Sequence, residues 1–163
     1  RLDMATSGLM VMARGPAAQR TLSMAFAARA VGKRYIAVVA GRLEAPEGEW
    51  GIIDLPIIVD WPNRPRRIVD HARGKPSVTR WRVLGHGADG QTTRVELEPV
   101  TGRSHQLRVH LRALGHPILG DALYAPPDVQ AMAGRLLLHA WRLELAHPVT
   151  GARLVFESAV PFG

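Results

Sequence analysis

The stretch Thr79-Arg80-Trp81-Arg82-Val83 alternates apolar or hydroxyl-bearing side chains with arginines, and Thr93-Arg94-Val95-Glu96-Leu97 repeats that alternation later in the chain. A period of two is typical of a strand that buries one face and exposes the other. Ala88-Asp89-Gly90 lies between the two stretches and supplies residues that favour a turn. The segment therefore predicts an antiparallel hairpin.

Further strands are predicted on either side of this hairpin from apolar or alternating runs. They lie at Gly8–Ala13, Tyr35–Ala40, Ile57–Val59, Leu136–Leu145 and Leu154–Phe156. The run Gly8–Ala13 is nearly unbroken in its apolar character, which predicts a buried central strand. Ile57–Val59 is the one strand expected in the proline-rich stretch 46–65, and the last two runs predict a second hairpin around the turn residues 147–151.

Two segments have the apolar spacing of helices. The first follows Pro16 and runs to about Arg29, and the second carries leucines at helical spacing over 107–114. Ser104 is the predicted N-cap of the second helix, and Gly115 is its predicted end. Many strands with two helices predict an α+β fold with a mixed, largely antiparallel sheet and few flanking helices. The length of 163 residues suits a single domain, 1–163.

The positive charge of the chain is concentrated in one segment. The formal net charge is +7, and the segment from Trp61 to Arg82 holds seven basic residues against one acid, Asp70, a net of +6. Those basic residues are Arg64, Arg66, Arg67, Arg73, Lys75, Arg80 and Arg82. Such a cluster is the electrostatic footprint of a nucleic-acid-binding protein, although a solvated basic face is an equally fair interpretation of charge alone. Trp61 and Asn63 beside the arginines favour RNA, because aromatic and guanidinium planes stack on unpaired bases.

Several other classes are excluded by what the sequence lacks. It contains no cysteine, no Gly-rich phosphate loop and no apolar run near the roughly 20 residues of a bilayer-spanning helix. No leader pattern opens the chain, so we expect a cytoplasmic protein that does not associate with membranes. His105, His110 and His116 invite a metal hypothesis, but they do not share one helical face, so we expect no metal site.

Two features carry candidate chemistry. Asp3 precedes a small, hydroxyl-rich loop that leads into an apolar run, where a sheet protein can hold a partly desolvated carboxylate; a turn-stabilising Asp is the commoner case. The helix after residue 104 places His105, Arg108 and Arg112 opposite its leucines. These arginines are either solvated charges or, if one reaches Asp3, a means of orienting that carboxylate.

Four stretches follow one another along the chain: Arg1-Leu2-Asp3-Met4-Ala5-Thr6-Ser7-Gly8-Leu9, Lys33-Arg34-Tyr35, Thr101-Gly102-Arg103-Ser104-His105-Gln106-Leu107-Arg108-Val109-His110 and Leu136-Leu137-Leu138-His139-Ala140. They resemble, in order, the motifs of the RluA-type pseudouridine synthases, and residues 115–121 continue the third motif. Asp60-Trp61-Pro62-Asn63-Arg64-Pro65 resembles the RluA subgroup, whose members modify both large-subunit ribosomal RNA and the anticodon stem-loop of transfer RNA. The catalytic domain of the family begins some dozens of residues earlier, so we interpret the chain as a single catalytic domain truncated at its N-terminus.

The resemblance implies an isomerase that acts on a nucleotide flipped out of folded RNA. The N1–C1′ bond of uridine is broken, the base turns, and the base is rejoined at C5. Nothing is reduced and no energy is supplied, so the resemblance implies no cofactor and no metal, with RNA as the partner and a monomer as the expected state.

The resemblance also implies a role for individual residues. Asp3 would be the catalytic carboxylate and Arg108 would pair with it. Tyr35 would stack on the base and help to remove the C5 proton. Leu138 would line the base pocket. The residues expected to bind RNA are Arg1, which would enter the gap left by the flipped base, with Asn63, Arg64, Arg66, Arg67, Arg103 and His105.

Two other functions remain open from the sequence. One is a non-catalytic RNA-binding module in which Asp3 is structural. The other is an acid–base hydrolase such as a glycosidase, which needs a second carboxylate near Asp3. The candidates for that second carboxylate are Asp54, Asp60, Asp121 and Glu144.

Overall fold

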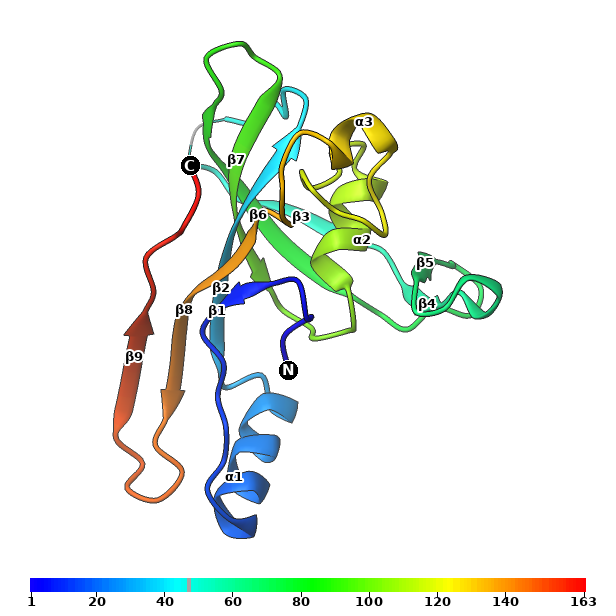
Figure 1. Cartoon of the computed structure of the whole chain (residues 1–163). Coiled ribbons are helices and arrows are strands. Elements are labelled where there is room, and N and C mark those ends of the chain that lie inside the picture. The colour runs from blue at the N-terminus through cyan, green and yellow to red at the C-terminus, as the bar shows by residue number, and fades with distance from the viewer. Residues whose placement is uncertain (47) are drawn as a thin grey trace.

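The computed structural model describes residues 1–46 and 48–163 (Figure 1). The strands are β1 Ser7–Gly8, β2 Gly32–Ala40, β3 Gly51–Asp54, β4 Ile57–Val59, β5 Arg67–Val69, β6 Val78–His86, β7 Thr92–Pro99, β8 Leu138–Ala146 and β9 Arg153–Glu157. The helices are α1 Pro16–Ala27, α2 Gln106–Ala113 and the short α3 Pro127–Gln130, and a 3-10 turn spans Trp61–Asn63. None of the helices in the described ranges is long and apolar enough to cross a membrane.

The sheet confirms the predicted fold class. Its strand order is β1-β8-β2-β7-β6-β3. β9 also pairs with β8, on the edge of β8 that faces away from β2. β1 pairs with β8 in parallel, and the other pairs are antiparallel, so the sheet is mixed. Both predicted hairpins form: Trp81 faces Leu97 across β6 and β7, and Leu143 faces Phe156 across β8 and β9.

The main core lies between the sheet and α2 (Figure 1). The leucines of α2 face the sheet, where Leu107 and Leu111 are buried against Val95 and Leu97 of β7. This packing explains the helical spacing of the leucines, since a surface helix buries one stripe of side chains. The side of α2 that faces away from the sheet is directed toward the N-terminal segment. Asp3 of that segment therefore lies near the helix.

Gly8–Ala13 is not the buried central strand that its apolar run predicts. Only Ser7 and Gly8 pair with β8, at the end of the strand order, and Gly8 adopts a φ of 111° so close to Ala140 that a Cβ would clash with its carbonyl. The chain then runs extended toward α1, with Leu9 and Val11 packed against a second, smaller core. Met10 and Met12 face outward, because alternate side chains of an extended chain point in opposite directions.

Two other expectations are corrected by the structure. The stretch 46–65 contains β3 as well as the predicted β4, and β3 pairs with β6 at the edge of the sheet. Ser104 does not cap α2. His105 is the N-cap residue instead, in the left-handed region at φ 57°, and makes no side-chain cap hydrogen bond. Gly115 follows the helix at φ 89°, as predicted.

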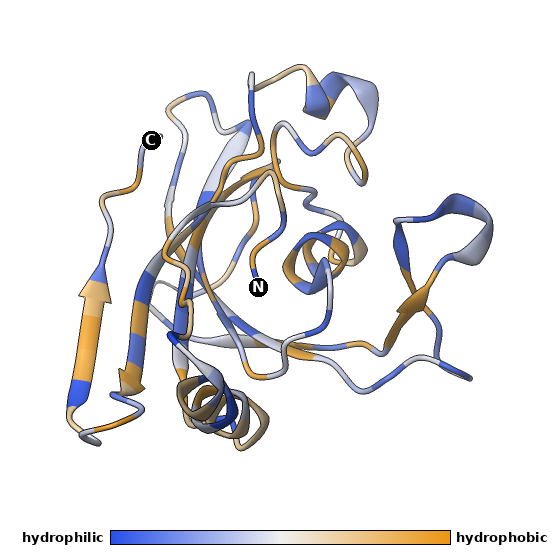
Figure 2. Cartoon of the chain, turned by 60° about the horizontal axis from the view of Figure 1, so that its bottom comes forward, coloured by the Kyte–Doolittle hydropathy of each residue, from blue (hydrophilic) through white to orange (hydrophobic). Residues whose placement is uncertain are grey.

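β4 and β5 form a separate two-stranded sheet that projects sideways from the domain (Figure 1). Figure 2 shows hydrophilic residues around the tip of this hairpin, with hydrophobic residues nearer its base. We call residues 57–69 the arm. The arm carries Arg64, Arg66 and Arg67 of the predicted basic segment and contacts α2 through β5. Arg80 and Arg82 of that segment lie on β6 instead, where they pair with Glu98 and Glu96.

Candidate active site

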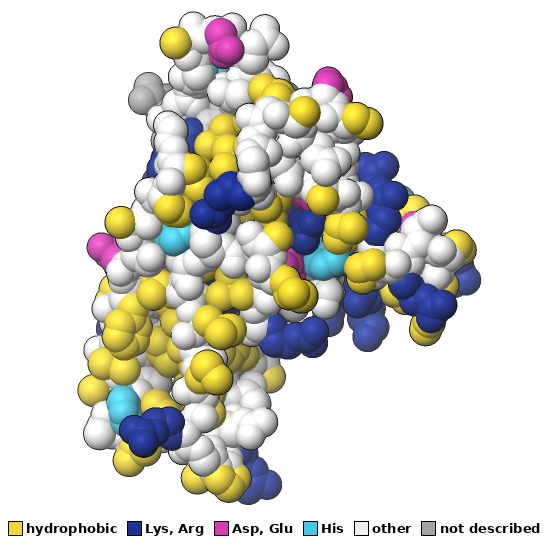
Figure 3. Space-filling view, in the orientation of Figure 1, with side chains coloured by type: hydrophobic (Ala, Val, Ile, Leu, Met, Phe, Trp, Pro, Cys, Tyr) yellow, Lys and Arg dark blue, Asp and Glu magenta, His cyan; other side chains and the backbone are white. Residues whose placement is uncertain are grey.

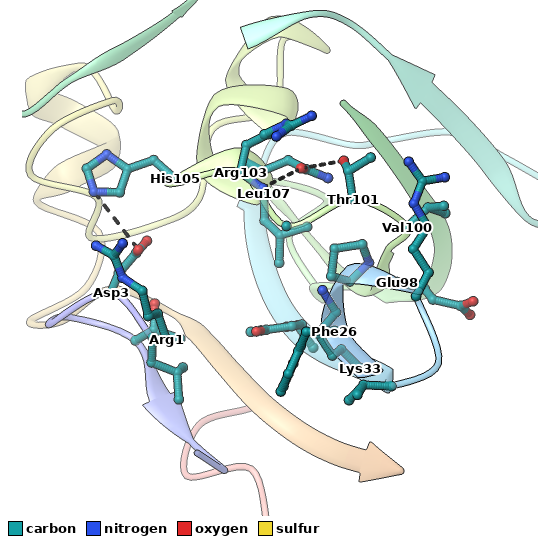
Figure 4. Close-up of a pocket in the computed structure, with 18 of the residues that line it drawn as sticks. Arg1, Asp3, Phe26, Lys33, Glu98, Val100, Thr101, Arg103, His105 and Leu107 are labelled. Atoms are coloured by element: carbon teal, nitrogen blue, oxygen red, sulfur yellow. Dashed lines mark hydrogen bonds and ion pairs between the residues drawn. The ribbon is translucent and has the colours of Figure 1, made fainter. Parts of the chain in front are cut away.

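A cleft of about 650 Å³ opens between the N-terminal segment, the start of β2 and the loop that leads into α2 (Figure 4). It is lined by Asp3, Tyr35, Arg108 and Leu138, which come from four segments distributed along the chain between residues 3 and 138. The structure thus brings together the three residues with predicted catalytic roles and the predicted pocket residue.

Asp3 and Arg108 are in contact. The Nη1 group of Arg108 lies 3.4 Å from Oδ2 of Asp3, and the arginine side chain is 5% exposed whereas that of Asp3 is 25% exposed. Arg108 is therefore not a solvated charge on the surface of α2. The contact orients one oxygen of Asp3 and leaves the carboxylate accessible from the cleft.

A second carboxylate holds Arg108 more closely. Asp121 is fully buried and accepts two hydrogen bonds from Arg108, at 2.7 Å and 3.0 Å, in a bidentate pair. Burial alone would lower the pKa of Arg108, but the hydrogen bonds and charge of Asp121, aided by Asp3, raise it. Asp121 thereby fixes the guanidinium in the position from which it reaches Asp3.

Tyr35 is a neutral phenol in this cleft. Burial, followed by the charge of Asp3, raises the pKa of its hydroxyl to about 12. Its side chain lies on the same face of β2 as Ala37 and packs against the main core. A protonated, rigidly packed ring suits stacking on a base better than it suits proton abstraction as a phenolate.

His105 lies between the arm and Asp3, with hydrogen bonds toward the arm and a longer contact with Asp3. The backbone N–H of Arg67 donates to the hydroxyl oxygen of Tyr124 at 2.9 Å, and the same hydroxyl is hydrogen-bonded to Nδ1 of His105 at 2.5 Å. Nε2 of that ring lies 4.0 Å from Oδ1 of Asp3. Burial lowers the pKa of His105 and the charge of Arg108 lowers it further, against the opposing effect of Asp3, so the ring is neutral at neutral pH.

The histidines do not form a metal site. His110 bonds Thr79 and the carbonyl of Leu55, and His116 bonds the carbonyl of Ala40, so each ring has its own separate partners. Within residues 1–46 and 48–163, no group of three or more His, Asp or Glu side chains could hold a metal ion.

The carboxylates weighed for a hydrolase are not available beside Asp3. None of the four lines the cleft. Asp121 is the nearest through Arg108, but its oxygens are occupied by Arg108 and by the backbone N–H groups of Leu123 and Tyr124. A glycosidase needs a second free carboxyl group across the substrate, so the geometry disfavours that alternative.

The chain matches the family model described as RNA pseudouridylate synthase over residues 1–113. It belongs to this family. It is 51% identical to the dual-specificity RNA pseudouridine synthase RluA of Escherichia coli (strain K12), over 99% of this chain and 72% of that protein. The RluA of Yersinia pestis is also 51% identical, over 99% of this chain and 77% of its own length.

A solved structure gives the same result for the fold. Human RNA pseudouridylate synthase domain containing 1 superposes on all of this chain and 68% of its own with a TM-score of 0.85, at 32% identity. The predicted family is thus confirmed, and the proteins similar to this synthase are named RNA pseudouridine synthases, which are isomerases.

The residues of this synthase that are expected to bind RNA lie in two places. Arg1, Arg103 and His105 line the cleft, whereas Asn63, Arg64, Arg66 and Arg67 lie on the arm outside it. Figure 3 shows Lys and Arg side chains gathered on one face between the N-terminal segment and the arm. Arg66 and Arg108 both lie against the ring of Tyr124, at 5.7 Å and 5.2 Å from its centroid, so the two places are connected.

Two residues of the synthase site were not predicted from the sequence. Tyr124 joins the arm to His105, and Asp121 anchors Arg108. Asp121 lies in the continuation of the third motif and was considered only as a second acid for a hydrolase. The sequence offered no signal for this role, because only the structure shows that Arg108 is buried and so needs a carboxylate partner in the interior.

Proposed function

We propose that this synthase isomerises specific uridines in 23S ribosomal RNA and in the anticodon stem-loops of transfer RNA to pseudouridine. The observation that carries the proposal is the 3.4 Å contact between Asp3 and Arg108 inside a cleft that Tyr35 also lines. The wider substrate range is supported by the dual specificity in the names of its relatives and by the resemblance of residues 60–65 to the RluA subgroup.

The cleft suits the atoms that must move. The N1–C1′ bond breaks, the freed uracil turns, and a C5–C1′ bond forms while C5 loses a proton and N1 gains one. Asp3 is the carboxylate that acts beside the ribose or the base, and Arg108 orients it. The uracil ring lies against Tyr35 and Leu138, which are held by core packing and limit the space in which the detached ring can turn.

The substrate must unstack one nucleotide before this chemistry can occur. Arg1 stands at the mouth of the cleft and is exposed, so it enters the RNA and occupies the gap left by the flipped base. The arm grips the folded stem-loop through Asn63, Arg64, Arg66 and Arg67. Since the arm is bonded to Tyr124, RNA on the arm and the carboxylate of Asp3 are placed by one set of contacts.

The reaction is an isomerisation, so the proposed enzyme needs neither a cofactor nor a metal and acts as a monomer through one catalytic domain, 1–163. Activity is expected to persist after treatment with a strong chelator. Light scattering is expected to give the mass of one chain, 17.8 kDa.

The central experiment is Asp3→Asn. We expect it to abolish release of tritium from RNA labelled at C5 of uridine while RNA binding persists, because the amide keeps the shape but not the charge. Asp128→Asn, on the exposed first turn of α3, is the matched control and should leave tritium release unchanged. Full activity of the Asp3 variant would refute the catalytic role of Asp3. If the unchanged protein binds RNA but releases no tritium, the chain is an RNA-binding module instead.

A further inference from the structure

The cleft extends well beyond the residues assigned to the reaction. Its far end, which we define as Phe26, Arg29, Lys33, Gly102 and Arg103, is formed by the end of α1, the start of β2 and the loop before α2. Figure 4 shows Phe26 and Lys33 across the cleft from Asp3 and His105. Pockets of about 300–1,000 Å³ enclose drug-sized ligands, so one uracil and its ribose leave part of a 650 Å³ cleft unfilled.

Lys33 is a partly buried ammonium group that lacks a carboxylate partner. Burial lowers its pKa, and no charged neighbour in the described part of the chain offsets that effect. Glu98 also lines this end, but its oxygens are directed at Arg34 and Arg80. A desolvated cation without a partner costs free energy, and an anion that enters the cleft would recover it.

The geometry of β2 relates Lys33 to the reacting base. Lys33 and Tyr35 both line the cleft whereas Arg34 does not, because alternate side chains of a strand share a face. Two residues along a strand span about 6.6 Å, a distance comparable with one step along an extended RNA strand. A nucleotide stacked on Tyr35 therefore has its neighbour within reach of Lys33.

Phe26 supplies an aromatic surface at the same end. It lies in the last turn of α1 and is 38% exposed, although it is a large apolar residue. Exposed aromatic rings beside cations are the usual platform on which single-stranded bases stack. Arg29 and Arg103 also line the cleft and add positive charge.

We propose that the far end of the cleft is a second nucleotide subsite, where Lys33 binds the phosphate of a nucleotide adjacent to the reacting uridine and Phe26 stacks on its base. The proposal rests on the proposed function, because the reacting uridine defines the neighbour. It predicts that the enzyme extracts at least two consecutive nucleotides from the folded loop.

The test couples protein variants to modified RNA. A synthetic RNA hairpin with one uridine in its loop is prepared with a single uncharged methylphosphonate at each loop phosphate in turn, and equilibrium binding is measured. At one phosphate next to the uridine, the methylphosphonate should weaken binding to the unchanged protein on the order of tenfold. The same replacement should have no effect on Lys33→Met, since the partner of that phosphate is already gone.

Lys75→Met is the matched control, because Lys75 is the other lysine of the chain and is exposed outside the cleft. It should keep the full response to that methylphosphonate. Phe26→Leu should likewise remove the effect of an abasic site at the same nucleotide, an effect of roughly 5- to 150-fold on binding, whereas Phe156→Leu on β9 should retain it.

The proposed subsite would be overturned if the loss of binding caused by Lys33→Met added independently to the loss caused by each methylphosphonate. It would also be overturned if Lys33→Met bound the unmodified RNA as tightly as the unchanged protein. Thermal unfolding of each variant identifies any that fails to fold, and Lys33→Arg, which keeps the charge, should then restore both folding and coupling. The readout is binding, so it is separate from turnover: pseudouridine formation without coupling refutes the subsite alone, and coupling without pseudouridine formation refutes the proposed function.

Discussion

The two faces of the sheet carry opposite arrangements of charge. In the cleft, one cation, Arg108, is shared by two carboxylates, Asp3 and Asp121. On the outer face, two cations hold one carboxylate: Arg34 and Arg82 both contact Glu96, which is 2% exposed. The same residue types therefore form an under-neutralised site on one side and a fully neutralised cross-strand brace on the other.

Trp50 reinforces this difference. Arg34, Arg80 and Arg82 all lie over its ring, at 4.7 to 5.2 Å from the centroid. All three outer arginines therefore make a cation–π contact in addition to their ion pairs. Asp3 has no such surroundings and makes a single 3.4 Å contact with the guanidinium. A carboxylate that is oriented but not saturated can react, whereas one that is saturated can only stabilise.

The sharpest test of this comparison is Asp3→Asn. We expect tritium release to fall by about 10³-fold or more, as when an essential catalytic group is removed, with the free energy of unfolding changed by less than about 1 kcal/mol. Denaturant unfolding and the tritium assay check the two halves. A large loss of stability would mean that Asp3 is part of a brace like Glu96.

Asp121→Asn should give the largest change in stability. It breaks a buried bidentate pair and leaves Arg108 with only its 3.4 Å contact to the partly exposed Asp3, which costs about 3–5 kcal/mol of unfolding free energy. Urea denaturation measures this loss. If the variant keeps full stability, Asp3 alone must hold Arg108, contrary to the distances.

Glu96→Gln should cost less, about 1–2 kcal/mol, because both of its arginines are about one-third exposed and can turn toward water. Tritium release per folded molecule should be unchanged. A fall in activity that exceeds the fall in folded protein would show that the outer face and the cleft are coupled.

Tyr124→Phe should have a smaller effect on stability, about 1 kcal/mol, since one hydrogen bond is lost on each side of the hydroxyl. The phenyl ring also removes the hydrogen-bond partner of Nδ1, so the pKa of His105 should change and the acid limb of the pH–rate profile should shift with it. An unchanged pH–rate profile would show that the contact from the arm through Tyr124 and His105 does not affect the reaction at Asp3.

Acid should weaken the cleft side through His110. Burial lowers the pKa of His110, which accepts a hydrogen bond from Thr79 and donates one to Leu55. An unfolded histidine has a pKa of about 6.5. Below that pH the unfolded chain binds a proton at residue 110, whereas the folded chain, in which the pKa is lower, does not. The free energy of unfolding therefore decreases as the pH falls through the folded pKa. The midpoint of thermal unfolding should drop by a few degrees between about pH 7.5 and 5, less so in His110→Gln, while the exposed His71→Gln should behave like the unchanged protein.

Local patterns in the sequence predicted most of the fold. The period of two in β6 and β7 and the leucine spacing of α2 each describe one buried face, and burial of such a face determines where an element packs. The run Gly8–Ala13 failed as a predictor because an apolar composition reports burial but not hydrogen-bonded partners. β8 already pairs with β2 and β9, so of that run only Gly8, together with the preceding Ser7, joins the sheet.

The candidate site divides in the same way. Motif resemblance identified Asp3, Tyr35 and Arg108, and the structure places all three in one cleft. It did not predict Asp121 or Tyr124 as partners, because no spacing rule connects a helix residue with a loop thirteen or more positions away. Nor did it separate Arg103 and His105, which line the cleft, from Arg64 and Arg66, which lie on the arm.

By itself, the sequence determined the family, the types of element and the identities of the reactive groups, because these follow from local composition and from motifs. Only the tertiary structure decided which carboxylate remains under-neutralised, which lysine lacks a partner and how the arm reaches Asp3. Those properties depend on distances and burial among side chains that are far apart in the chain, and the strength of an electrostatic interaction is set by distance and solvent exposure rather than by sequence position.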